Sequence, residues 1–252
     1  MPQALAAGLW GLFGGSALIM GALVGYFLRL PQRLIAAIMA LGAGVLISAV
    51  AFELVDEAFV RSGAQPTAIG LGTGALAYTI ANINVSRAGA RHRKRSGSDP
   101  NASQDASAGS GAAIAVGALL DGIPESVVIG VSLVEGGSVS LAVAAAVFLS
   151  NIPEGLSSAA GMKQAGRKAP YVLGLWVGIA LASGLAALVG NAMLADAGPE
   201  VLALTLAFAG GAVLAMIVDT MVPEATEKTH EYTGLIAVVG FFAAFLLSKL
   251  GG

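Results

Sequence analysis

The sequence predicts an all-α polytopic membrane protein. Of its 252 residues, 56% are hydrophobic and only 11% are Asp, Glu, Lys or Arg, whereas a soluble domain carries about 25% charged residues. The apolar residues form continuous runs, without the alternation of a membrane β-barrel strand. A water-soluble fold could not cover this much apolar sequence. The composition therefore argues against a soluble enzyme, a nucleic-acid-binding protein and, with no cysteine present, a disulfide-stapled secreted domain.

The apolar runs are long enough to be membrane-spanning helices. One crossing needs about 20 mostly apolar residues, and the chain provides eight such runs within one transmembrane domain over 1–252. We expect the spans at 4–28, 34–60, 66–86, 111–134, 138–162, 170–191, 200–222 and 232–250. No Lys or Arg precedes Arg29, so the first run reads as a permanent helix and not as a cleavable signal peptide.

The distribution of basic residues predicts the orientation of the spans. With both termini outside, eleven of the 13 Lys and Arg residues fall on the cytoplasmic side and only Arg61 and Lys249 fall outside. Cytoplasmic loops of membrane proteins are enriched in Lys and Arg. The cytoplasmic set is Arg29, Arg33, Arg87, Arg91, Arg93, Lys94, Arg95, Lys163, Arg167, Lys168 and Lys228. We therefore expect a multi-pass protein of the inner, or plasma, membrane.

The one long loop, at 87–110, is basic at its start and rich in Ser, Gly, Asn and Asp afterwards. Such a sequence cannot bury a core, and we expect it to be disordered in the cytoplasm. Elsewhere, small residues recur at the spacing that lets helices pack closely: Gly11 and Gly15, Gly21 and Gly25, Gly70 and Gly74, and Gly174 and Gly178. These pairs suit packing within the bundle, and a homodimer interface is the alternative.

Two segments of the chain resemble each other without gaps. Residues 41–58 align with 208–225, so that Gly44 falls on Gly211 and Glu57 on Glu224. The two segments belong to spans of opposite direction, which is the pattern of an inverted repeat. We expect spans 1–3 and 6–8 to be the two repeats, arranged around central spans 4 and 5.

The ionisable residues placed deep in the spans are acidic. Carboxylates inside a membrane are costly and mark ion or proton pathways by default. In span 4, Asp121 and Glu125 lie one helical turn apart on the same face, with Pro124 between them. In span 5, Asn151 and Glu154 flank Pro153, and Ser150 adds a hydroxyl. Each proline kinks its helix and frees the carbonyl four residues earlier. We expect the two segments to form a cation site.

The remaining acids are weaker candidates. Glu53, Asp56 and Glu57 close span 2 on the outer side, where they form either a solvated rim or a vestibule that attracts cations. Asp219 and Glu224 close span 7 on the inner side, where they would line an exit route. The weaker metal candidates are therefore Asp219, Glu224 and Glu57.

The chain resembles the ZIP family of divalent-metal transporters over nearly its whole length. The resemblance is carried by eight spans, the polar loop after span 3, the span 5 motif Asn-Ile-Pro-Glu-Gly at 151–155, and the related Asp-Gly-Ile-Pro-Glu-Ser at 121–126. It implies metal binding by Asp121, Glu125, Asn151 and Glu154, with Ser150 as a contributor. Asp121 stands where the family has His, and span 6 has no carboxylate, so a second bridged metal would lack a ligand.

The resemblance implies a transported Zn²⁺ and no permanently bound cofactor. Oxygen ligands suit harder ions, and Mn²⁺, Mg²⁺ and Fe²⁺ remain alternatives, because the site has lost the imidazole that suits zinc. The expected function is transport by alternating access. Two other functions stay open: a transport-dead metal sensor or structural protein, and an exchanger similar to calcium/cation antiporters. An enzyme is not expected, because no predicted span holds a histidine.

Overall fold

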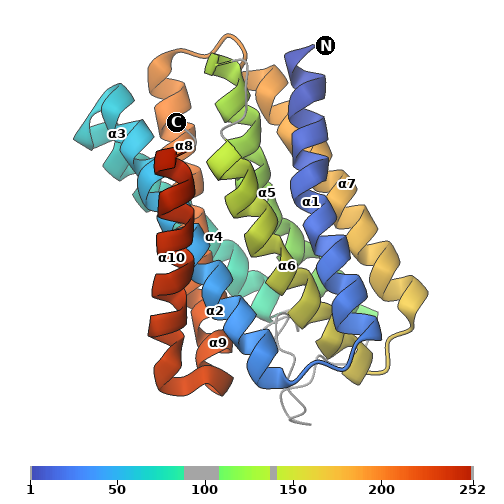
Figure 1. Ribbon diagram of the computed structural model, residues 1–252. Coiled ribbons are helices and arrows are strands. Elements are labelled where there is room, and N and C mark those ends of the chain that lie inside the picture. The colour runs from blue at the N-terminus through green and yellow to red at the C-terminus, as the bar shows by residue number, and fades with distance from the viewer. Residues whose placement is uncertain (1, 88–107, 137–140, 251–252) are drawn as a thin grey trace.

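The protein is a bundle of long helices in a computed structural model that describes residues 2–87, 108–136 and 141–250 (Figure 1). No strand occurs among these residues. The first half contains α1 (Gln3–Phe27), α2 (Gln32–Ala49), α3 (Asp56–Ser62), α4 (Ala64–Val85) and α5 (Ala108–Gly136). The second half contains α6 (Leu141–Gln164), α7 (Ala169–Leu194), α8 (Pro199–Met216), α9 (Val222–Thr229) and α10 (Thr233–Leu250). The predicted all-α class is confirmed.

Two of the long helical segments, α2–α3 and α8–α9, each contain a π-helical turn. Val50–Val55 joins α2 to α3, and Ile217–Met221 joins α8 to α9. A π-helical segment often marks a functional site inside an α-helix. The sequence pattern did not predict these segments, because they change the hydrogen-bond register without changing the apolar character of the rod.

Six helical stretches in the described part of the chain are long and apolar enough to cross a membrane. They are Gln3–Phe27, Gln32–Ser62, Ala64–Val85, Val116–Val134, Ala169–Leu194 and Pro199–Leu250. The last stretch contains α8 and α10, which run in opposite directions after the turn at His230 (Figure 1). A multi-pass membrane protein is therefore indicated. The eight crossings stay a prediction, because α6 is not among these stretches.

The connections between helices lie at the two ends of the bundle. The α1–α2, α6–α7 and α9–α10 connections gather at the lower end in Figure 1, and the α3–α4 and α7–α8 connections lie at the upper end. Gly63 and Gly166 adopt positive φ angles of 77° and 78° just after α3 and α6. Glycine reaches this region without strain, which lets the chain leave each helix sharply. Three basic residues that we predicted to be cytoplasmic lie in these lower connections. Arg29 lies between α1 and α2, and Arg167 and Lys168 lie between α6 and α7.

Most of the predicted loop at 87–110 lies outside the described residues. Only its ends are described, and there the prediction needs a correction: α5 begins at Ala108, so residues 108–110 are helical. Long, mostly apolar sequence follows directly, which allows the helix to start before the span itself.

The helices pack into two groups. In the first, α1 packs against α6 and α7, and α5 packs against α7. In the second, α2 packs against α10, and α4 packs against α8. The groups meet mainly where α2 contacts α6 and where α5 contacts α8. We refer to these as the α1/α5/α6/α7 group and the α2/α4/α8/α10 group.

The second group contains two helix pairs with the same type of close contact. A Cβ added to Gly44 would overlap the carbonyl oxygen of Ala237, and one added to Gly240 would overlap that of Leu41, where α2 meets α10. Where α8 meets α4, Gly211 approaches the backbone of Leu71 and Gly74 that of Phe208 in the same way. Each glycine therefore lets two helix backbones touch.

The predicted glycine pairs have different outcomes. Cβ atoms added to Gly11 and Gly15, to Gly21 and Gly25, or to Gly70 and Gly74 would collide with a neighbouring helix, as expected for packing glycines. Gly174 and Gly178 have open space beside them. The packing prediction was wrong for this last pair within the bundle, because its face of α7 points away from every described helix.

Candidate cation site in α5 and α6

The central part of α5 buries two carboxylates. Asp121 and Glu125 are one turn apart around Pro124, and their exposed fractions are 1% and 4%. The Tyr78 hydroxyl of α4 donates a hydrogen bond to Oδ1 of Asp121 at 3.0 Å. Ser126 donates its hydroxyl proton to the Gly122 carbonyl oxygen within α5. The predicted pair therefore lies in the interior, and Asp121 already has a partner from another helix.

The matching part of α6 buries the other predicted residues. Ser150, Asn151 and Glu154 surround Pro153, with exposed fractions of 1%, 4% and 5%. Ser150 donates its proton to the Val147 carbonyl oxygen at 2.9 Å, so its oxygen keeps lone pairs for other uses. Asn151 donates from Nδ2 to the Gly14 carbonyl oxygen of α1 at 3.0 Å.

The amide oxygen of Asn151 is a buried acceptor. Oδ1 has no hydrogen-bond partner among the described residues. An unsatisfied buried polar atom costs about 1–3 kcal/mol and is uncommon in native proteins. The bond from Nδ2 to Gly14 fixes the orientation of the amide. The residue thus offers a neutral oxygen of the type that hard cations accept.

Neighbouring backbones hold the Pro-Glu segment of α6 in place. A Cβ added to Gly155 would overlap the carbonyl oxygen of Leu18, and one added to Gly21 would overlap that of Ile152. On the side of α2, a Cβ on Gly42 would lie 2.9 Å from Cγ of Pro153. The segment is therefore enclosed by α1 and α2, which leaves its side chains little room to reorient.

Deep acids without buried bases are the main electrostatic feature of the interior. The buried charged residues in the described part of the chain are Asp121, Glu125 and Glu154, and no Lys or Arg is among them. The weaker metal candidates are not buried. Glu57 is exposed and forms an ion pair with Arg61, Asp219 is exposed, and Glu224 is half-buried.

Glu53 lies closer to the interior of the bundle than the exposed Glu57 of the same acidic cluster. Glu53, on the π-helical turn after α2, is half-buried and accepts a hydrogen bond from Ser248 of α10. It also lines a small cavity of about 20 Å³ together with Glu125, between aliphatic side chains that include Leu54 and Val147. A space of this size holds about one water molecule. Sequence position identified Glu53 only as part of the outer acidic cluster.

The predicted residues do not form a preassembled metal centre. Within the described residues, no three His, Cys, Asp or Glu side chains come together at a spacing that could hold a metal ion. The structure therefore brings Asp121 and Glu125 together on α5, and Ser150, Asn151 and Glu154 together on α6. It does not close the two sets into one cluster of three acids.

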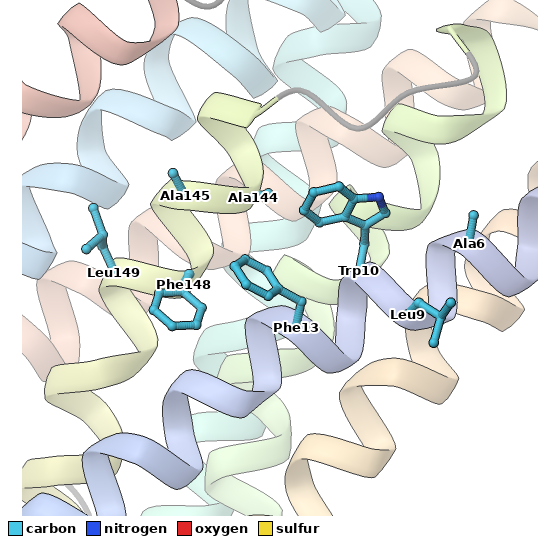
Figure 2. A pocket seen from close by; sticks show the side chains of 8 residues that line it. All are labelled: Ala6, Leu9, Trp10, Phe13, Ala144, Ala145, Phe148 and Leu149. Carbon is cyan, nitrogen blue, oxygen red and sulfur yellow. The ribbon is translucent and has the colours of Figure 1, made fainter.

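A larger pocket is apolar, and none of these carboxylates lines it. It has a volume of about 560 Å³ and lies between α1 and α6 (Figure 2). Figure 2 shows the rings of Trp10, Phe13 and Phe148 beside each other at this pocket. Phe13 and Phe148 stack with ring centroids 4.8 Å apart. Phe148 belongs to the same helix as Ser150 and is half-buried at this pocket. This pocket has no groups that could bind a cation.

Tyr78 is the contact residue that sequence reasoning missed. A single tyrosine in an apolar span carries no motif, and only the packing of α4 beside α5 shows which carboxylate it meets. Neither a comparison with models of known protein families nor one with curated proteins gives a match for this chain.

Proposed function

We propose that this protein is a ZIP-like transporter of divalent metal cations, with its cation site in α5 and α6. The observation that carries the proposal is the burial of Asp121, Glu125 and Glu154 beside two prolines inside helices, with no buried Lys or Arg in the described chain. Ionisable groups inside a membrane-spanning bundle are costly and mark ion pathways by default. A divalent cation would bring positive charge to these carboxylates, and it is the substrate of the protein.

The available donors suit a cation that accepts oxygen. Carboxylates of α5 and α6, the Asn151 amide oxygen, the Ser150 hydroxyl oxygen and the carbonyls freed by the prolines are all oxygen donors. Such a set favours Mg²⁺ or Mn²⁺, while Zn²⁺ also accepts carboxylates. Zn²⁺ is the substrate implied by the ZIP resemblance, and Mn²⁺, Mg²⁺ and Fe²⁺ are the alternatives. Binding would require α5 and α6 to bring their two sets of ligands together.

The architecture supports transport through the proposed inverted repeat. Segments 41–58 and 208–225 each contain a π-helical turn, and the turns begin at the aligned residues Val50 and Ile217. The aligned glycines Gly44 and Gly211 make equivalent backbone contacts with α10 and α4. Repeats of this kind support alternating access by movement of one group of helices against another. Here the moving units would be the two packing groups.

The proposed topology has eight crossings and both termini outside. The connections at the lower end in Figure 1 contain Arg29, Arg167 and Lys168, whereas Arg61 precedes the connection at the upper end. Such a bias supports a cytoplasmic location for the lower end, because cytoplasmic loops are enriched in Lys and Arg. At that end, Tyr26 of α1 donates to the Arg167 carbonyl oxygen at 3.0 Å, which ties the first and third cytoplasmic connections together.

Uptake by proteoliposomes tests the proposal. Zn²⁺, Mn²⁺, Mg²⁺ and Fe²⁺ would be offered one at a time to vesicles containing the parent, Glu125→Gln or Glu154→Gln. We expect the parent to take up at least one cation, and both variants to lose at least about tenfold of that rate, as for removal of one charged ligand. Glu200→Gln is the matched control, because Glu200 is exposed in the first turn of α8 and is not among the candidate ligands. Parental rates in both buried-acid variants would refute the site.

A metal sensor without transport is the second candidate. It is favoured by the separation of the three buried acids, since no described group of three closes around a cation. In this case the parent would bind a divalent cation at equilibrium, with loss of binding in Glu125→Gln, and would show no uptake of any cation. Binding together with uptake would exclude it.

A further inference from the structure

The hydrogen bond between Tyr78 and Asp121 joins the two packing groups at the candidate site. Tyr78 lies on α4, which packs against α8, and Asp121 lies on α5, which packs against α7. The hydroxyl donates to Oδ1 at 3.0 Å, and the exposed fractions of the two residues are 2% and 1%. The bond is therefore fully shielded from water.

A phenol that donates to a buried carboxylate does two things. It supports negative charge on the carboxylate through a charge-assisted hydrogen bond, which is about twice as strong as a neutral one. It also restricts rotation of the carboxylate plane, because the donor comes from a different helix. A ligand that is held in orientation loses less freedom when a cation binds than one that rotates.

The position of the bond adds a mechanical consequence. Any movement of the α1/α5/α6/α7 group against the α2/α4/α8/α10 group changes the distance between α4 and α5. The orientation of Asp121 then depends on the relative position of the groups. Tyr78 thus connects the second group directly to one of the predicted site residues.

We propose that Tyr78 is a positioning residue that orients the Asp121 carboxylate for the cation and makes that orientation depend on the contact between the two helix groups. The inference rests on the proposed function. In the conformation described here, the hydroxyl holds Asp121 in its ligand orientation. Movement of α5 away from α4 breaks the bond, frees the carboxylate to rotate and weakens cation binding on the other side of the transport cycle.

Equilibrium binding of Mn²⁺ to the purified full-length protein tests the positioning role without requiring transport. Tyr78→Phe removes one hydroxyl and keeps the ring. We expect it to raise the Kd for Mn²⁺ by about tenfold, the usual effect of losing a hydrogen bond to a charged group. Tyr26→Phe is the matched control, since its hydroxyl also donates to another segment, at the Arg167 carbonyl, but not at the site. We expect Tyr26→Phe to bind Mn²⁺ with the same Kd as the parent protein.

A double-variant cycle separates positioning from general packing. In the background of Asp121→Ala, Tyr78→Phe is expected to leave the Kd unchanged, because the carboxylate that it orients is gone. An equal increase of the Kd in both backgrounds, or a parental Kd for Tyr78→Phe, would overturn the proposal. Should Tyr78→Phe not be recovered as folded protein, Tyr78→Met fills the same space without a hydroxyl and serves in the same cycle.

Uptake kinetics separate this inference from the proposed function. In vesicles, Tyr78→Phe is expected to raise KM with no fall in the maximal rate, because it weakens the ligand and releases a contact between the moving groups. If the parent binds Mn²⁺ with the expected dependence on Tyr78 and moves no cation, transport fails and positioning stands. If uptake depends on Glu125 and Glu154 and KM is indifferent to Tyr78, transport stands and positioning fails.

Discussion

Asn151 uses one end of its amide to fix itself to Gly14 and keeps the other end as a buried acceptor. Nδ2 donates to the Gly14 carbonyl oxygen at 3.0 Å, and Oδ1 has no hydrogen-bond partner in the described part of the protein. The close approach of α1 and α6 makes this contact available. The arrangement gives Asn151 both a structural contact and a ligand atom, and the two can be tested separately.

Replacement of Asn151 by Ala is expected to lower stability and cation uptake together. The loss of one buried hydrogen bond costs about 0.5–1.5 kcal/mol of unfolding free energy. Asn191→Ala provides the matched control, because Asn191 of α7 donates in the same way to the Gly130 carbonyl oxygen at 3.0 Å. For Asn191→Ala we expect a similar loss of stability in thermal unfolding, and cation uptake equal to that of the parent. Equal uptake in both variants would remove Asn151 from the ligand set.

Asp121→His is expected to shift the preference of the site toward Zn²⁺. Imidazole suits Zn²⁺, whereas carboxylates suit harder ions such as Mg²⁺ and Mn²⁺. The ratio of Zn²⁺ to Mn²⁺ uptake in proteoliposomes measures the change. Asp196→His places the same side chain at an exposed position outside the candidate site and should leave the ratio as it is. If Asp121→His changes the rate for all cations by one common factor, residue 121 does not set selectivity.

Gly155→Ala is expected to destabilise the protein through the contact between α6 and α1. The added methyl would overlap the Leu18 carbonyl oxygen, and the helices must then separate. Overpacking of this kind costs about 1–3 kcal/mol. Gly178→Ala adds the same methyl where nothing lies within 4 Å, and helix propensity favours Ala there. Thermal unfolding in detergent should rank Gly178→Ala at or above the parent and Gly155→Ala clearly below it.

Fluorescence of the two tryptophans tests the placement of the bundle in a bilayer. Trp10 lines the apolar pocket, whereas Trp176 is 1% exposed. In vesicles of lipids with brominated acyl chains, we expect strong quenching of Trp10 in a Trp176→Phe variant and weak quenching of Trp176 in a Trp10→Phe variant. The reverse order would show that this face of α1 does not meet lipid.

Cysteine labelling tests the proposed crossings. The chain has no cysteine of its own, so single variants report without background. We expect Ala165→Cys, between α6 and α7, to react with an impermeant maleimide only in inside-out vesicles. Ala197→Cys, between α7 and α8, is expected to react in intact cells. Reaction of both from one side would mean that α7 does not cross the membrane.

The sequence determined the class of the fold and the helices that carry the buried acids. Long apolar runs need an apolar solvent whatever their partners are, and the described residues of the predicted span ranges are almost all helical. The spacing of Asp121 and Glu125, and that of Asn151 and Glu154 around Pro153, are properties of single helices. Their common faces follow from 3.6 residues per turn. These features are local, so they could be derived before any packing was known.

The rotation of each helix and the contacts between its side chains depend on how the helices pack together. A helix that is apolar all round has no face that must point inward. For this reason the sequence could not show that Tyr78 meets Asp121, that Glu53 shares a cavity with Glu125, or that Gly174 and Gly178 face away from the bundle. Rotation is set by close backbone contacts such as Gly155 with Leu18. Those contacts join residues far apart in the chain.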